Sequence, residues 1–319
     1  MKILIVGGLG YIGGRLASNF RKNSKAEIFL TTRRNQRHFP KWADEFQIYK
    51  MDMLDEASVR RCFDAVKPDT VVHLGAIDRV TCMKDPDEAI AVNVGGTKKL
   101  IHQAHENGIR KFIYFSTFHV YGDLIGNITE AHTLSPAHLY AESKLKAEEF
   151  VRAFSVKGMR TLIFRVSNGY GYPMDHFVGE HVWTLAFNVF CKEAIADGKI
   201  TIRSNQYRNF IALEDIAHAV HYFLFTIPDQ WGDGIFNLGG ERCILIKEVA
   251  EEISRVYEKH YNRGPLKIEM PVEEKSIWLE AFRFNIEKLK QTGFRLTGNM
   301  ETEILGTMRL CEHRMKENF

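Results

Sequence analysis

The chain has 319 residues, of which 45% are hydrophobic, enough for two domains or for one large α/β domain with a sizeable core. Its formal net charge is +3, from 43 Lys and Arg residues against 40 Asp and Glu residues. A charge this small and dispersed excludes an extended face for nucleic acid, so we expect no nucleic-acid partner.

The cysteines favour a reducing compartment. They are odd in number, widely spaced and never in a C-x-x-C arrangement, which disfavours both a disulfide framework and a zinc site. We expect reduced thiols and no metal. The apolar run before the first glycine is too short for a signal peptide, and no later stretch has the length of a membrane span. The expected location is cytoplasmic, with no membrane partner.

The first part of the chain alternates strand-like and helix-like segments. It begins with a β-branched run at Lys2–Val6, which glycines close, and a helical pattern at Tyr11–Lys22. Further strands are predicted at Glu27–Thr32, Phe46–Met51, Thr70–Leu74, Lys111–Phe115 and Arg160–Arg165. Further helices are predicted at Ala57–Val66, Pro86–Asn107 and Leu139–Val156. This alternation predicts an α/β fold whose parallel sheet is covered on both faces.

The glycines Gly7, Gly10 and Gly13 follow the first strand and open the first helix. In G-x-x-G-x-x-G the first glycine permits a tight turn, the second lets backbone approach a pyrophosphate, and the third allows close packing of helix on strand. The amino terminus of the helix, with Tyr11 and Ile12, then faces the anion. This order of elements predicts a dinucleotide-binding domain with a Rossmann-type, doubly wound parallel sheet.

After about residue 165 the alternation becomes less regular. Glycine-rich and aromatic segments mix with helical patterns at Val182–Asp197 and Ile246–Tyr261. This change predicts a smaller lobe for substrate over the carboxyl ends of the strands. We expect residues 1–170, joined by about 210–239, to form the dinucleotide-binding domain, and residues 171–319 to form the smaller C-terminal lobe.

The end of the second strand should select between the nicotinamide cofactors. A carboxylate there would bind the adenosine ribose of NAD, but this chain has Thr31, Thr32, Arg33 and Arg34. A guanidinium can bind a 2′-phosphate through two hydrogen bonds, which favours NADP(H). NAD(H) is the alternative. Threonine hydroxyls can hydrogen-bond the ribose of NAD, and the arginines can belong to a solvated basic loop that binds no phosphate.

Asp52 and Met53 follow the third strand, in KMDMLD. The Asp52 carboxylate is placed there to meet the adenine amino group. A helix N-cap explains an aspartate at this place nearly as well, so capping is the alternative to cofactor binding.

Tyr140 and Lys144, in YAESK, are four residues apart and therefore lie on one face of a helix. A phenol is a poor base, because its reference pKa is about 10. A neighbouring ammonium favours the phenolate, and Lys144 can also hydrogen-bond the nicotinamide ribose. Thr117, with Ser116 as its rival, would end the fifth strand and present a hydroxyl to the same substrate oxygen as Tyr140. These residues predict proton transfer beside a nicotinamide ring.

The chain resembles the extended short-chain dehydrogenase/reductase family, whose members mostly act on nucleotide sugars. The resemblance spans nearly the whole chain, through GGLGYIGG, MDMLD, VVHLGA, NVGGTKKLI, STFHVYG, YAESK, RVSNGYG, RNFIALEDIA and FNLGG. In the family pattern the reactive hydroxyl lies five residues before the glycine of V-Y-G, which selects Thr117 over Ser116.

The resemblance implies further residues around the cofactor and the substrate. Those implied at the cofactor are Leu74, Gly75 and Ala76, as a wall, and Asn93, as a partner for backbone near the reactive tyrosine. Asn168 and Arg208 match positions that hold the substrate diphosphate, a task that suits a guanidinium. Relatives commonly dimerise through two long helices, which here are Pro86–Asn107 and Leu139–Val156, so a homodimer is expected.

In this family the residue two positions after Thr117 faces the sugar. By resemblance, that position holds a glutamate in 4,6-dehydratases and a cysteine in GDP-fucose synthase-like epimerase-reductases. This chain has Phe118 and His119 there. The Asp-Glu pair of the dehydratases is missing, which argues against dehydration. His119 can exchange a proton at carbon because a histidine pKa lies near working pH; a role in shape or hydrogen bonding alone is the alternative.

The sequence therefore predicts an enzyme that uses NADP(H) to reduce a keto group of a nucleotide-activated sugar. Tyr140 supplies the proton, Thr117 polarises the oxygen, and Lys144 holds the tyrosine and the ribose. The alternative is an epimerase that retains its cofactor, with His119 exchanging a proton. A sensor without catalysis is disfavoured, because the chain keeps all the residues that the chemistry needs.

Overall fold

The computed structural model describes residues 1–33, 39–176, 178–270 and 282–317. Within these residues the centre is a parallel sheet of seven strands, in the order β11-β7-β5-β4-β1-β2-β3. They are β1 (Lys2–Val6), β2 (Glu27–Thr32), β3 (Gln47–Lys50), β4 (Thr70–His73), β5 (Lys111–Thr117), β7 (Arg160–Val166) and β11 (Ile235–Leu238). Each pairing in this sheet is parallel, so the predicted α/β fold is confirmed.

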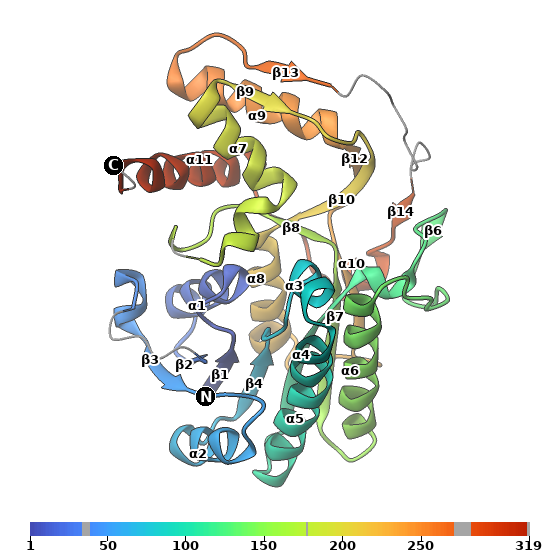
Figure 1. The fold of residues 1–319 in the computed structure, drawn as a ribbon. Helices are drawn as coiled ribbons and strands as arrows, with labels where there is room; N and C mark the ends of the chain where they lie inside the picture. Colours follow the sequence, from blue (N-terminus) through green and yellow to red (C-terminus); the bar gives the residue numbers. More distant parts are fainter. Residues whose placement is uncertain (34–38, 177, 271–281, 318–319) are drawn as a thin grey trace.

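Helices cover both faces of the sheet (Figure 1). The helices on one face are α1 (Tyr11–Asn23) and α8 (Leu213–His221). Those on the other face are α2 (Glu56–Val66), α5 (Thr97–Glu106) and α6 (Leu139–Ser155). Successive β1 residues point to opposite faces, so Ile3 and Ile5 join the first core and Leu4 joins the second. The sheet is therefore doubly wound, as the alternation of elements predicts.

The structure divides two of the predicted helices. The segment from Pro86 consists of α4 (Pro86–Ile90), a π-helical segment at Ala91–Gly96, and then α5. π-Helical turns are rare and occur frequently at functional sites. The segment near residue 182 consists of a 3-10 turn at Glu180–Thr184 and α7 (Ala186–Asp197), because Leu185 between them has extended backbone, with φ −65° and ψ 136°.

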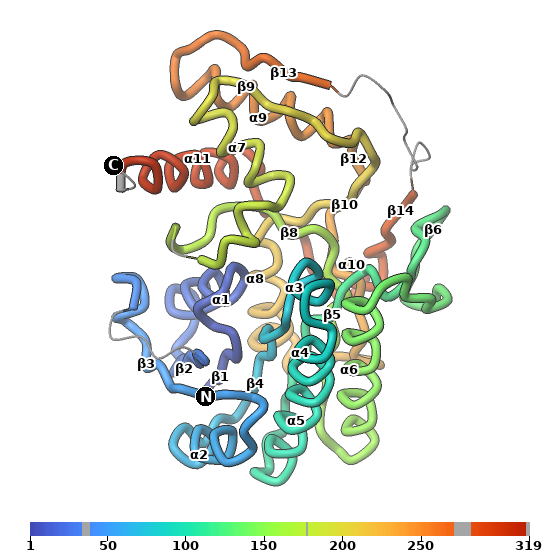
Figure 2. The backbone as a smooth tube through the Cα atoms, in the orientation of Figure 1, coloured from blue at the N-terminus to red at the C-terminus, as the bar shows by residue number. Residues whose placement is uncertain are grey.

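The smaller lobe has its own hydrophobic core and lies over the sheet domain (Figures 1 and 2). Its helices are α7, α9 (Ile246–Tyr261) and α11 (Met300–Glu317). Its strands are β8 (Asn168–Tyr170), β9 (Lys199–Thr201), β10 (Tyr207–Ala212), β12 (Cys243–Leu245) and β13 (Lys267–Glu269). The remaining elements are α3 (Arg79–Lys84), β6 (Asn127–Ile128), β14 (Arg283–Phe284) and α10 (Glu287–Gln291). In the described part of the chain, no helix combines the length and the apolar character needed to cross a membrane.

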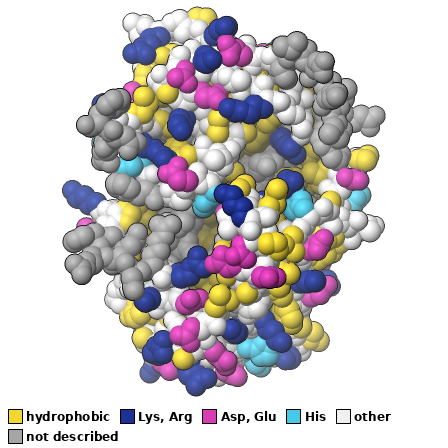
Figure 3. Space-filling model, in the orientation of Figure 1, with side chains coloured by type: hydrophobic (Ala, Val, Ile, Leu, Met, Phe, Trp, Pro, Cys, Tyr) yellow, Lys and Arg dark blue, Asp and Glu magenta, His cyan; other side chains and the backbone are white. Residues whose placement is uncertain are grey.

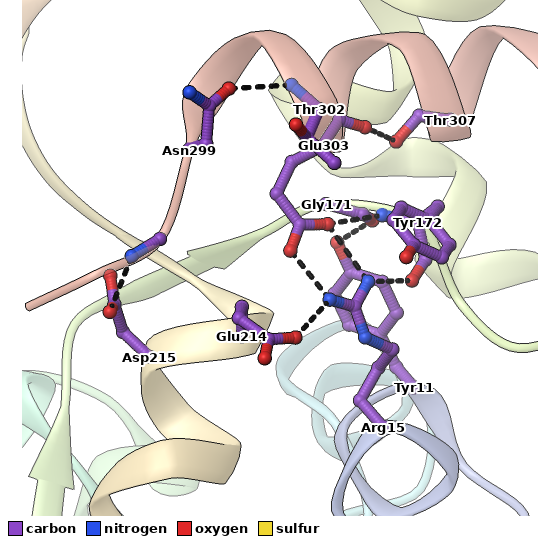
Figure 4. Close-up of polar contacts among 11 residues, drawn as sticks. Tyr11, Arg15, Gly171, Tyr172, Glu214, Asp215, Asn299, Thr302, Glu303 and Thr307 are labelled. Atoms are coloured by element: carbon purple, nitrogen blue, oxygen red, sulfur yellow. Dashed lines mark hydrogen bonds and ion pairs between the residues drawn. The ribbon is translucent and has the colours of Figure 1, made fainter. Parts of the chain in front are cut away.

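A buried ion pair joins the lobe to the sheet domain (Figure 4). Arg15 on α1 donates from Nη1 and Nη2 to both carboxylate oxygens of Glu303 on α11, at 2.9 and 2.7 Å. The side chains are 5% and 2% exposed. Arg15 also donates to the half-exposed Glu214 on α8 and to the Tyr172 carbonyl. The guanidinium therefore holds three segments of the chain against the first helix of the sheet domain.

We expect Glu303→Gln to lower the free energy of unfolding by about 3 kcal/mol, because removing one partner leaves a buried guanidinium without its carboxylate. The matched change Glu214→Gln removes a carboxylate that is 48% exposed and should cost at most about 1 kcal/mol. Urea unfolding curves measure both. Equal losses in the two variants would show that burial does not decide the contribution of this pair.

Candidate active site

The carboxyl ends of the central strands and the smaller lobe enclose a cavity of about 740 Å³. Figure 3 shows the molecule hollowed between these two parts, with dark blue and cyan side chains near the hollow. The cavity brings together most of the predicted site residues. Those that line it are Gly7, Gly10, Tyr11, Ile12, Gly13, Thr32, Arg33, Asp52, Met53, Leu74, Gly75, Ala76, Thr117, His119, Tyr140, Lys144, Asn168 and Arg208.

Two predicted residues are not among them. Arg34 lies outside the described residues. Asn93 is buried in the π-helical segment behind the cavity wall and does not line the cavity, but it has the expected role of a partner for backbone. Its amide holds the Ile77 backbone, accepting from the nitrogen at 2.7 Å and donating to the carbonyl at 3.2 Å, and donates to Ser143 Oγ. Since Ser143 Oγ donates to the Tyr140 carbonyl, Asn93 supports backbone beside Tyr140.

The glycine turn fits a dinucleotide. Gly7 has φ +83°, and a Cβ there would lie 3.0 Å from the Gly75 nitrogen. A Cβ on Gly13 would lie 2.3 Å from the Gly7 carbonyl oxygen, so α1 packs against the turn at a distance that only glycine allows. Gly10 is the N-cap of α1 and places the free amides of its first turn at the cavity. The turn therefore has the space and the donors that a pyrophosphate needs.

The end of the cavity at β2 and β3, where the adenosine of the cofactor is expected, differs from the predictions in two details. Arg33 forms an exposed ion pair with Glu88 on α4, at 3.0 Å. Asp52 is not a helix N-cap, because Asp55 caps α2 by accepting from the Ala57 nitrogen. The Asp52 carboxylate accepts from the nearby Leu54 nitrogen at 2.9 Å, so the capping alternative for Asp52 is wrong.

Tyr140 and Lys144 both face the cavity from α6, but their pKa values are shifted in directions that the sequence did not predict. Burial raises the pKa of Tyr140 above its ordinary value, with smaller contributions from Cys82 and Asp78. Burial also lowers the pKa of Lys144 to about 7. The Lys144 ammonium lies 4.3 Å from the ring centroid of Tyr114, beneath α6. Burial thus favours the protonated phenol of Tyr140, and a phenolate stabilised by Lys144 stays a prediction.

The hydroxyls at the end of β5 are both buried and both line the cavity. Thr117 Oγ1 accepts a hydrogen bond from the His119 nitrogen at 3.3 Å. Ser116 Oγ and Ser167 Oγ have no hydrogen-bond partner among the described residues. Buried polar groups are normally satisfied, so these hydroxyls fit polar groups of a bound ligand. Ser116 is therefore also a candidate contact.

Burial favours the neutral form of the His119 imidazole. Burial lowers its pKa to about 3, and the positive charges of His138, Arg79 and Arg208 lower it further. This direction argues against the expected pKa near working pH and against proton exchange by His119. A neutral imidazole presents one N–H donor and one acceptor nitrogen.

Sequence reasoning missed several residues around this centre. His138 is the N-cap of α6, accepts from the Ala141 nitrogen, and stacks its ring 6.2 Å from that of Tyr140. Glu148 forms a buried ion pair with Arg165 on β7 at 2.8 Å, which anchors α6 to the sheet. The signal for Glu148 was available, because it follows Lys144 by four residues and lies on the same helix face.

We expect Lys144→Met to raise the melting temperature at pH 6 by a few degrees, with a smaller gain at pH 9.5. Because its pKa is lowered, Lys144 loses its proton above pH 7 in the folded chain but keeps it up to about pH 10.4 in the unfolded chain. The free energy of unfolding of the wild type therefore rises with pH across this window. The exposed Lys146 on the same helix gives the control, Lys146→Met, whose effect should not vary with pH in this way. A pH-independent difference for Lys144→Met would contradict the lowered pKa.

A comparison with known families identifies the chain. Residues 3–239 match the model of the NAD dependent epimerase/dehydratase family. The chain is 27% identical over 285 residues to a dTDP-glucose 4,6-dehydratase of Neisseria meningitidis, covering 79% of this chain and 77% of that protein. It is 28% identical to a UDP-glucose 4-epimerase of Rhizobium meliloti, covering 82% of this chain and 84% of that one.

Solved structures agree with these relatives. The UDP-Glc/GlcNAc 4-epimerase of Campylobacter jejuni superimposes with a TM-score of 0.81 and 25% sequence identity. The match covers 98% of this chain and 99% of that one. Both the sheet domain and the smaller lobe are therefore shared with a solved epimerase.

Proposed function

This chain belongs to the NAD-dependent epimerase/dehydratase family, and we propose that it catalyses hydride transfer between a nicotinamide dinucleotide and a nucleotide-activated sugar. Its homologues are enzymes of the short-chain dehydrogenase/reductase kind. The observation that carries the proposal is that Thr117, Tyr140 and Lys144 line the same cavity as the glycine turn. One cavity therefore offers a place for the dinucleotide and an acid at the reacting end.

Reduction of a keto group is the direction we propose. A bound nicotinamide would supply the hydride. Tyr140 would give its proton to the substrate oxygen; burial keeps the phenol protonated, but the raised pKa also makes it a weaker acid. Thr117 would hydrogen-bond the same oxygen. Lys144 would hold the nicotinamide ribose and, when charged, strengthen Tyr140 as a donor.

Epimerisation with a retained cofactor is the second candidate. The similarity to the Campylobacter jejuni and Rhizobium meliloti 4-epimerases favours it. The lowered pKa of His119 makes it a weak base, so transient oxidation of the sugar and return of hydride by the retained cofactor is the form of epimerisation that this site favours. Dehydration has less support despite the Neisseria meningitidis relative, because Phe118 and His119 stand where dehydratases of the resembled family carry an acidic pair.

Absorbance at 340 nm separates the two candidates. Reduction consumes added NADPH or NADH in proportion to the keto-sugar supplied. Epimerisation leaves that absorbance unchanged, converts the sugar with cofactor that co-purifies with the protein, and is followed by chromatography of the nucleotide sugar.

We expect Tyr140→Phe to lower turnover by about 10²–10⁴-fold, the usual contribution of a positioned acid. Affinity for the dinucleotide should change less than about threefold, because the glycine turn is untouched. Tyr49→Phe on β3, outside the cavity, is the control and should keep full turnover. Steady-state kinetics and fluorescence titration of the cofactor measure the two effects. A Tyr140→Phe variant with full activity would remove Tyr140 from the chemistry.

We also propose that NADP(H) is preferred over NAD(H) through Arg33. Arg33 lines the cavity at the end of β2, and its ion pair with Glu88 holds the guanidinium there. Arg33→Ala should weaken NADPH at least about tenfold and NADH less than twofold, because a bidentate contact to phosphate is lost. Glu88→Gln should leave NADPH binding as tight or tighter. Equal weakening of both cofactors by Arg33→Ala, measured by calorimetry, would show that Arg33 does not read the 2′-phosphate.

A further inference from the structure

The Lys144 side chain ends over an aromatic ring and not beside a carboxylate. Its ammonium lies 4.3 Å from the centroid of the Tyr114 ring, inside the distance of about 6 Å at which a ring face attracts a cation. Both residues are buried, with exposed fractions of 3% and 1%. Within the part of the chain that the structure describes, this ammonium forms no hydrogen bond and no ion pair. The ring face is therefore the group that the charge of Lys144 meets directly.

The nearest carboxylate on the same helix is bound to another residue. Glu148 follows Lys144 on α6 at the spacing that allows a carboxylate to pair with a lysine. Its oxygens accept instead from Arg165 on β7, from Nε at 3.2 Å and from Nη2 at 2.8 Å. This pair is itself buried. The structure thus gives the carboxylate to a guanidinium and leaves the lysine to the ring.

Tyr114 lies beneath the active site and not in it. It belongs to β5, the strand that ends at Thr117, and is not among the residues that line the cavity. Its ring packs against the ring of His73 on the neighbouring β4, with centroids 5.5 Å apart, and its hydroxyl reaches the Lys144 carbonyl at 3.5 Å. Burial raises the pKa of Tyr114, so its ring stays a neutral phenol. Tyr114 can therefore hold the lysine from below without touching a ligand.

The other titratable groups around Lys144 do not offer it a free negative charge. They come from α6 itself and from the elements packed against it, and are Tyr140, Glu148, Cys82 on α3, His73 and Arg165. Burial raises the pKa of Tyr140 and of Cys82, and lowers that of His73 to about 3, so these three are neutral at pH 7. Glu148 and Arg165 neutralise each other.

We propose that Tyr114 is a positioning residue of this active site, and that the face of its ring holds the Lys144 ammonium at the cavity wall by a cation–π contact. A ring face attracts a cation without accepting its N–H donors, so the ammonium keeps both its charge and its hydrogen bonds for the nicotinamide ribose. A carboxylate in the same place would compete with the ribose for these donors. This inference rests on the proposed function, because it explains how Lys144 serves the cofactor.

The first test follows the titration of Lys144 by NMR of labelled lysine side chains in the intact chain, with Lys144→Met to assign the signal. The wild-type midpoint should lie near the lowered pKa of about 7. Tyr114→Phe keeps the ring and should leave the midpoint unchanged. A ring-fluorinated phenylalanine at position 114 weakens the negative face at nearly the same volume, and should lower the midpoint by about one pH unit. Tyr114→Met removes the ring and should act likewise.

The control is Phe112→Leu, which removes another buried ring from the same face of β5. It should leave the Lys144 midpoint unchanged.

The second test measures affinity for NADH and NADPH by fluorescence titration across the neutral and alkaline range. Affinity should fall as Lys144 loses its proton. The fall should come about one pH unit lower with the fluorinated ring or with Tyr114→Met than with wild type or Tyr114→Phe. A purely structural role for Tyr114 would instead weaken binding by the same factor at every pH.

Two results would overturn the inference. One is a Lys144 midpoint that does not move when the ring is fluorinated. The other is a Tyr114→Phe variant that shifts as far as the fluorinated one, which would assign the effect to the hydroxyl. If Tyr114→Met does not fold, the fluorinated ring still decides, because it fills the same space. Failure of both dinucleotides to bind the wild type would refute the proposed function, while the NMR midpoints would still decide the contact.

Discussion

The site depends on the buried ion pair between the Arg15 guanidinium and the Glu303 carboxylate. Arg15 lies on α1, the helix that begins at the glycine turn, and binds Glu303 in the last helix of the lobe. One turn earlier, Tyr11 donates to the Gly171 carbonyl at 2.7 Å. The lobe is therefore attached to the same helix that presents its amino terminus to the cofactor space.

Burial controls the chemistry inside that cavity. It raises the pKa of Tyr140, lowers that of Lys144 to about 7, and lowers that of His119 to about 3. These directions share one cause, because a low dielectric disfavours the charged form of every titratable group. A bound anion would act in the opposite direction on the lysine and the histidine. The protonation of the site is thus coupled to the charge of what it binds.

Particular residues show where sequence reasoning succeeds and where it fails. The glycine turn, the strand at Lys2–Val6 and the spacing of Tyr140 and Lys144 are local patterns, and the structure brings them together as expected. Asn93 was expected from the family resemblance, not from a local pattern. Its place behind the wall depends on the π-helical segment and on hydrogen bonds to Ile77 and Ser143, which are distant in the chain.

The sequence by itself determined the parallel α/β fold, the dinucleotide turn and the helix that carries Tyr140 and Lys144. Hydrophobic period, glycine positions and a spacing of four residues express short-range sterics, which a linear chain displays. Only the tertiary structure decided that Arg15 meets Glu303 across 288 residues, that Arg33 meets Glu88 across 55, and that Lys144 faces Tyr114. Such partners are chosen by packing and desolvation between distant segments, and those forces leave no periodic pattern in the chain.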